Sequence, residues 1–404
     1  MSDQLDERCP CGSGRSRRAC CNAASPRRHA AEDNTRQLQS RLVALVLAAD
    51  PAERCRIVRH AIEDGLDDAE LAFDLIAIVR DAGDRMVFGE LVATLRDRAP
   101  ALFASHAIWY IDWLIEDALL DNQEEALSSL CTQLVFVADQ DEEIFAFIVD
   151  RLAYFGRLSL LALLLPQVVQ HSGIRHAHTD EILLLSRWHN DQVSPNSDAA
   201  GSQALHSSGE TLATRWLAQL NMPTTAEIPA PPAESATRDA WQLWLEQLTY
   251  RFLVELIRHD HIPATRGSLA RSALATYLIE RLIPVAIPTT RHRLRSGRRN
   301  IPAAHNHATH GAARSIPDRA SLEAYLAHLI DLPSPRYYAA AALLELTPAW
   351  LRFLEQHALV SHAERMTAIQ QLRSLVVDSL DIWGAPPTGI TVAPNIRMAW
   401  EEAD

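Results

Sequence analysis

Four of the six cysteines lie in one short segment near the start of the sequence, where their spacing points to metal chemistry. Two thiols one residue apart are followed by Gly-Ser-Gly, and two adjacent thiols end the segment; the four are Cys9, Cys11, Cys20 and Cys21. This spacing lets one small loop surround a single tetrahedral ion. Zinc held by four thiolates has no open position for water, so such a site stabilises structure and does not catalyse. We therefore predict a structural Zn²⁺ module in residues 1–24.

The neighbouring residues suit such a module. Gly12 and Gly14 can adopt the positive φ values that turn the chain back on itself. One zinc ion and four thiolates carry a net negative charge, which Arg15, Arg17 and Arg18 can offset. A segment this short has no hydrophobic core, so the bound metal must supply its folding free energy.

A pair of disulfides is the alternative for the same four thiols. Disulfides need an oxidising compartment, whereas the first 37 residues contain no apolar run of the kind that a signal peptide requires. We therefore expect a cytoplasmic protein whose thiols bind metal.

The pattern C-x-C-x8-C-C, with Pro10 between the first thiols and Gly-Ser-Gly after them, resembles the SEC-C zinc motif over residues 8–22. That motif is best known from the C-terminal tail of the bacterial secretion motor ATPase, where it binds an export chaperone and the ribosome. The resemblance implies that the four cysteines are the ligands and that the module docks a partner. The sequence departs from the family at Arg17, where an aromatic residue is usual, and at Asn22, where Gly is common.

The composition excludes several classes of function. The chain has 404 residues, enough for two domains, and it contains no run of 18 apolar residues, so we expect no membrane span. It contains no lysine, which excludes a lysine Schiff base and a lysine-dependent phosphate loop. The G-x-S-x-G, H-E-x-x-H and dinucleotide fingerprints are also missing. We therefore assign no catalytic residue.

The net charge of −13 is unevenly distributed along the chain. Residues 61–150 contain 21 Asp and Glu against 4 Arg, whereas the loop 286–317 contains no acid. Its closely spaced cations include Arg293, Arg295, Arg298 and Arg299. We expect these arginines to pair with the acidic helices of the chain itself or with an external polyanion such as RNA.

Amphipathic segments of about 10 to 20 residues with short turns predict an all-α fold without a β-rich block. Antiparallel helix pairs stacked as a helical-repeat-like scaffold fit this pattern, although the tetratricopeptide signature is not present. Asp50-Pro51-Ala52-Glu53 predicts a helix start, as does Thr347-Pro348. The helix expected over residues 35–49 carries an apolar stripe of Leu38, Leu42, Leu45 and Val46.

Composition also predicts the division of the chain. After the zinc module and an arginine-rich connector over residues 23–31, an acidic helical domain covers residues 33–188. Residues 189–236 form a linker with one short helix. A second helical domain covers residues 237–382 and contains the basic loop 286–317, and residues 383–404 form an extended tail.

The tryptophan pairs and the acidic pairs have structural interpretations. Trp241 and Trp244 share one face of a helix, which is typical of core aromatics. Acidic pairs such as Asp67-Asp68 lie near predicted helix starts, where carboxylates cap the helix. Neither set requires a catalytic role.

These observations favour a zinc-binding interaction or adaptor protein, in which the module docks a protein partner to a helical scaffold. The alternative is a nucleic-acid- or ribosome-associated protein that uses the module and the basic loop as its contacts. An enzyme with dispersed catalytic residues is the third hypothesis.

The purified protein should carry about one Zn²⁺ per chain, because four thiolates complete one tetrahedral shell. Metal analysis after purification without chelator measures this ratio. Since the module is local, chelation should leave the helical far-UV circular-dichroism signal nearly intact. Absence of bound metal in protein produced with ample zinc contradicts the site. A cooperative loss of helix on chelation places the metal elsewhere.

Overall fold

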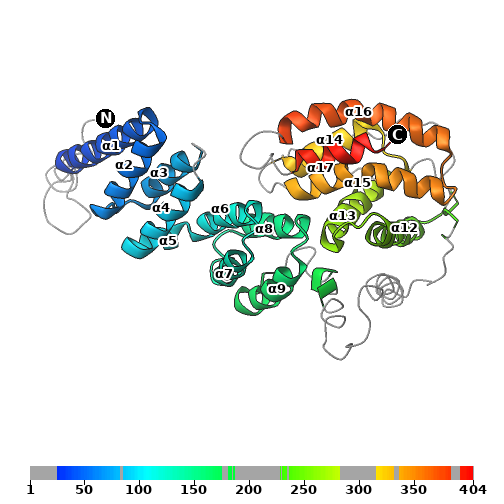
Figure 1. Cartoon of the computed structure of the whole chain (residues 1–404), viewed down its shortest axis with the longest axis horizontal. Helices are drawn as coiled ribbons and strands as arrows, with labels where there is room; N and C mark the ends of the chain where they lie inside the picture. Colours follow the sequence, from blue (N-terminus) through cyan, green and yellow to red (C-terminus); the bar gives the residue numbers. More distant parts are fainter. Residues whose placement is uncertain are drawn as a thin grey trace, which may run out of the picture. The chain divides into compact units, whose positions relative to one another are not determined.

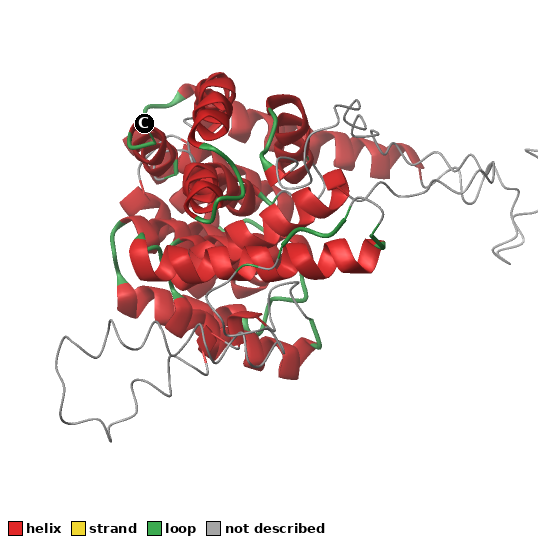
Figure 2. Ribbon diagram, turned by 90° about the vertical axis from the view of Figure 1, so that its right-hand side faces the viewer, coloured by secondary structure: helices red, strands yellow, loops and turns green. Residues whose placement is uncertain are grey.

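The computed structural model describes residues 25–81, 85–174, 181–183, 185–186, 228, 230–233, 236–282, 315–331, 336–383 and 392–403. Over these ranges the regular secondary structure is helical and contains no strand, which confirms the all-α class (Figures 1 and 2). None of the helices found there is both long enough and apolar enough to cross a bilayer. The chain divides into two compact units, Met1–Tyr110 and Ile111–Asp404, called unit 1 and unit 2 below.

Unit 1 is built from consecutive helices, of which the first three each pack against the next helix and the one after it. They are α1 (Ser25–Ala48), α2 (Pro51–Glu63), α3 (Ala69–Asp81), α4 (Arg85–Arg98) and α5 (Pro100–Ser105). Helix α1 contacts α2 and α3, α2 contacts α3 and α4, and α3 contacts α4 and α5. The predicted start of α2 is confirmed, because Asp50 caps it by accepting a hydrogen bond from the Glu53 backbone N–H at 2.9 Å.

Helix α1 differs from the prediction in length and in burial. It begins at Ser25, so the expected connector over residues 23–31 is wrong; Pro26 lies in the first turn, where proline is tolerated. Of the predicted stripe, Val46 is fully buried, but Leu38 and Leu45 are 66% and 55% exposed. Periodicity shows which residues share a face and does not show whether a neighbouring helix covers it.

Unit 2 surrounds one central helix, α15 (Tyr337–Gln356), in which every residue from Tyr337 to Leu351 is buried. Helix α15 contacts α8, α12, α13, α14, α16 and α17 (Figure 1). The helices with most or all of their length in this unit are α6 (Ala107–Leu120), α7 (Glu124–Leu134), α8 (Glu142–Tyr154), α9 (Leu158–Ser172), α12 (Arg238–His259), α13 (Ala264–Leu282), α14 (Arg319–Ile330), α15, α16 (His362–Trp383) and α17 (Ala393–Glu401).

The division between units lies elsewhere than the boundary that composition predicts at residues 189–236. Helix α8, on the near side of that segment, packs against α13 and α15 on its far side. The contacts include a buried carboxylate, Asp150, which accepts from Arg336 Nη2 at 3.1 Å. A buried charge must be paired, and here its partner is far away in sequence.

The predicted helix start at Thr347-Pro348 is wrong, because α15 continues through Pro348. A proline has no N–H, so the carbonyl of Leu344, four residues earlier, loses its helical donor. The indole Nε1 of Trp400, on α17, donates to this carbonyl at 2.9 Å. Helix α17 therefore replaces the hydrogen bond that Pro348 removes, and α15 stays continuous.

The expected extended tail over residues 383–404 is also wrong, because it contains α17. Pro394 lies in the first turn, where a missing N–H is harmless. Ile396 and Trp400 are buried, and α17 packs against α15 and α16. Composition alone predicts a coil here, whereas burial of two large apolar side chains stabilises the helix.

Replacing Trp400 by Phe should lower the free energy of unfolding by about 1–3 kcal/mol through the orphaned Leu344 carbonyl, in addition to any packing loss. In a Pro348→Ala background the same replacement should cost less, because the backbone N–H restored at position 348 can donate to that carbonyl. Chemical denaturation of the wild type, both single variants and the double variant measures the coupling. Equal losses in both backgrounds contradict the compensation.

Candidate functional site

The site residues predicted from sequence all lie outside the described residues, so the structure neither gathers nor separates them. They are Cys9, Cys11, Cys20, Cys21, Arg15, Arg17, Arg18, Arg293, Arg295, Arg298 and Arg299. Among the residues that the structure does describe, no group of three or more His, Cys, Asp or Glu side chains could hold a metal ion. The zinc module therefore stays a prediction from the cysteine spacing.

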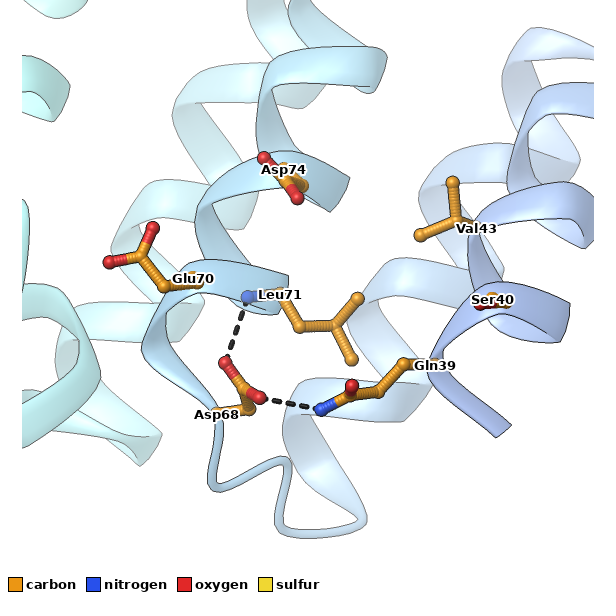
Figure 3. Close-up of a pocket in the computed structure, with 7 residues that line it drawn as sticks. All are labelled: Gln39, Ser40, Val43, Asp68, Glu70, Leu71 and Asp74. Atoms are coloured by element: carbon orange, nitrogen blue, oxygen red, sulfur yellow. Dashed lines mark hydrogen bonds between the residues drawn. The ribbon is translucent and has the colours of Figure 1, made fainter. Parts of the chain in front are cut away.

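A hollow of about 500 Å³ lies in unit 1 between α1 and α3 (Figure 3). Its lining combines aliphatic and acidic side chains and consists of Gln39, Ser40, Val43, Asp68, Glu70, Leu71 and Asp74. Figure 3 shows Gln39 and Leu71 pointing from the two helices into the space between them. We call this feature the α1–α3 hollow.

Asp68 fixes one end of the α1–α3 hollow. Its Oδ1 accepts from the Leu71 backbone N–H at 3.0 Å, which caps α3 as the acidic pair Asp67-Asp68 predicts. Its Oδ2 accepts from Gln39 Nε2 at 2.5 Å, which ties α3 to α1. This carboxylate is therefore held in place by two donors and fixes the position of the rim.

The other two carboxylates of the α1–α3 hollow face solvent. The Glu70 side chain is 81% exposed and lies 3.5 Å from Nε2 of His106, and Asp74 is exposed. Leu71 is buried beneath them and Val43 is half-buried. Three carboxylates without a cation among the lining residues create a negative potential that attracts basic groups.

Among the described residues, several buried charges lie together in unit 2, around Arg151. This guanidinium donates through Nη1 to Asp112 Oδ1 at 2.7 Å and through Nε to the Tyr338 hydroxyl at 2.8 Å. Its side chain is 1% exposed. Burial by itself lowers the pKa of Arg151, but Asp112, Tyr338 and Glu116 outweigh burial and raise it above its usual value.

A second buried polar cluster is centred on Tyr154, three residues after Arg151 on α8. The Tyr154 hydroxyl donates to Glu345 Oε2 at 2.6 Å, and Arg266 Nη1 donates to Glu345 Oε1 at 3.0 Å. Asn395 Nδ2 donates to the same hydroxyl at 3.2 Å. Burial raises the pKa of Tyr154 well above its ordinary value, and the negative charge of Glu345 raises this pKa further. These groups are enclosed and satisfied by one another, so they hold helices together rather than await a substrate.

Sequence reasoning missed both buried groups, although a signal for them exists. Asp150 and Arg151 interrupt the apolar segment of α8, and Glu345 interrupts a run of Ala and Leu in α15. A charge inside an apolar run marks a buried charge that needs a partner. Which partner it finds depends on tertiary contacts.

A smaller hollow of about 150 Å³ lies between α13, α14 and α15. Its polar lining includes Glu280, His328 and Arg336, and Arg336 already pairs with Asp150. This volume accommodates about five water molecules and falls below the size of ordinary ligand pockets. It gives no support to the enzyme hypothesis.

Comparison with protein-family models, with characterised proteins and with solved structures finds no match to this chain. The resemblance to the SEC-C motif therefore depends on the four cysteines and their immediate neighbours.

Thiol titration should separate two classes of cysteine. Cys55 and Cys131 are buried in the helical units, and burial raises the pKa of the Cys131 thiol to about 12, so almost no thiolate is present at pH 8. Native protein should therefore react slowly, chelated protein should expose the four thiols of the zinc module, and denatured protein should expose all six. Fast reaction of six thiols without denaturant contradicts the burial, and four slow thiols after chelation contradict the zinc site.

Proposed function

We propose that this chain is a zinc-binding interaction protein, in which the N-terminal cysteine module docks a protein partner to a helical-repeat-like scaffold. The observation that carries the proposal is the α1–α3 hollow, an open acidic surface with an aliphatic floor. Helix α1, which forms one wall, begins at Ser25, four residues after Cys21, the last cysteine of the module. A partner held by the module is therefore close in sequence to a second binding surface.

The packing of unit 1 supports the scaffold part of the proposal. Helices α1, α2 and α3 each contact the next helix and the one after it, which is the contact pattern of stacked helix pairs. Such stacks cover only one side of each helix and leave extended surfaces for partners. The exposed Leu38 and Leu45 of α1 agree with this arrangement.

The charge of the α1–α3 hollow favours a protein partner over RNA at this surface. Nucleic-acid affinity depends on neutralising phosphates with cations. The carboxylates of Asp68, Glu70 and Asp74 instead repel phosphates. The RNA alternative then depends on the arginines of the zinc module and of the loop 286–317 alone.

Affinity purification of the tagged chain from its native extract, with and without nuclease, tests this function. We expect a protein partner that resists nuclease and is lost from the Cys9→Ser/Cys11→Ser variant, because two missing thiolates abolish the tetrahedral site. Cys131→Ala is the matched control, since this thiol is buried outside the zinc module.

Two results contradict the proposal. Recovery that disappears with nuclease and falls steeply with salt identifies a nucleic-acid-associated protein instead. Recovery of the same partner by the Cys9→Ser/Cys11→Ser variant shows that the zinc module does not dock it.

A further inference from the structure

The aliphatic floor of the α1–α3 hollow continues beyond the residues that line it. On α1, Leu47 lies one turn after Val43 and is 55% exposed. On α3, Ile78 lies one turn after Asp74 and is half-buried. Figure 3 shows that residue numbers rise in the same direction along both helices, from Gln39 to Val43 on α1 and from Leu71 to Asp74 on α3. Since each lies one turn further along its helix, helical spacing puts Leu47 and Ile78 beyond the same end of the hollow.

The resulting surface combines two features that one kind of ligand matches. An apolar strip formed by the exposed Leu47, the half-buried Val43 and the outer edge of the buried Leu71 offers contacts to aliphatic side chains. The carboxylates of Glu70 and Asp74 stand beside this strip and face solvent, where they can pair with guanidinium groups. An amphipathic segment with an aliphatic stripe and flanking arginines complements both features.

The geometry favours a helical ligand over an extended one. An extended peptide binds chiefly through the backbone of an exposed strand edge, and the described part of the chain has no strand. A groove between two helices instead receives the side chains of a third helix. The stretch from Asp68 to Ile78 covers about 15 Å of helix axis, which corresponds to a ligand of roughly three turns.

We infer that the α1–α3 hollow binds an arginine-bearing amphipathic helix of a partner protein. This inference rests on the proposed function as an interaction protein and assigns the chemistry of the partner at this surface. The zinc module and the α1–α3 hollow would then make separate contacts, and each can be removed without the other.

A fluorescent synthetic helix of 14 residues, with Leu at i, i+4, i+7 and i+11 and Arg beside them, serves as the probe. Its binding to the full-length, zinc-loaded chain is measured by anisotropy at several salt concentrations. A scrambled peptide of the same composition and an Arg→Glu peptide are the ligand controls. We expect saturable binding of the amphipathic peptide alone, weakening as salt rises because the rim pairs are exposed.

Variants of the chain locate the binding surface. Glu70→Gln/Asp74→Asn and, separately, Leu47→Ser should each weaken binding by about tenfold. The matched controls are Glu63→Gln/Asp97→Asn, which removes the same charge from unit 1, and Leu38→Ser, which replaces an exposed leucine on the opposite side of α1. These changes alter exposed side chains, so far-UV circular dichroism should remain that of the wild type.

Three outcomes overturn the inference. One is the absence of saturable binding, and a second is an equal loss in the hollow variants and their controls, which indicates attraction to net charge only. The third is binding that appears only after Arg293, Arg295, Arg298 and Arg299 are replaced by Ser, which assigns the hollow to the chain's own basic loop.

The two proposals fail in different ways. If the partner recovered from extract is lost with the Cys9→Ser/Cys11→Ser variant but kept by Glu70→Gln/Asp74→Asn, the interaction function stands and the hollow assignment is wrong. If the peptide binds as expected while the cysteine variant keeps every partner, the hollow assignment stands and docking by the zinc module is wrong.

Discussion

A guanidinium enclosed in an apolar interior needs carboxylates around it, and in unit 2 this requirement determines how α8 is held. Arg151 is paired with Asp112 and bonded to the Tyr338 hydroxyl, and its neighbour Asp150 is paired with Arg336. Removing one partner of a buried pair typically costs about 3–5 kcal/mol, since the other charge is left unpaired. These pairs therefore specify which helices may meet, beyond what apolar contact requires.

The central helix of unit 2 meets a related constraint in its backbone. Helix α15 is buried on all sides over most of its length, so each of its backbone groups needs a partner inside the protein. Pro348 removes one donor, and the indole of Trp400 on α17 replaces it at the Leu344 carbonyl. The end of the chain is thus needed to complete the middle of α15. The charge of Arg151 and the Leu344 carbonyl are thus both satisfied by groups from other helices of the same unit.

In unit 1, several charged and aliphatic side chains face solvent instead of one another. Glu70 and Asp74 face solvent beside a partly exposed aliphatic strip, and three leucines of α1 remain more than half exposed. Groups left outward in this way are available to a partner, whereas the buried groups of unit 2 are already occupied by one another. For this reason the proposed binding surface lies on α1 and α3, although the stronger electrostatic interactions lie in unit 2.

The sequence by itself determined the helical class, the start of α2 with its cap at Asp50, and the capping role of Asp68, because these depend on local periodicity and on hydrogen bonds within one turn. The zinc module stays a prediction from sequence, because Cys9, Cys11, Cys20 and Cys21 lie close together in the chain and outside the described residues. Only the tertiary structure decided the rest. Helix α15 continues through Pro348, and the tail contains the helix α17. Val46 is buried whereas Leu45 is exposed. Helix α8 packs against helices more than a hundred residues later in the chain. The α1–α3 hollow belongs to this second group, because its residues come from two helices and no local pattern shows which faces a third helix leaves uncovered.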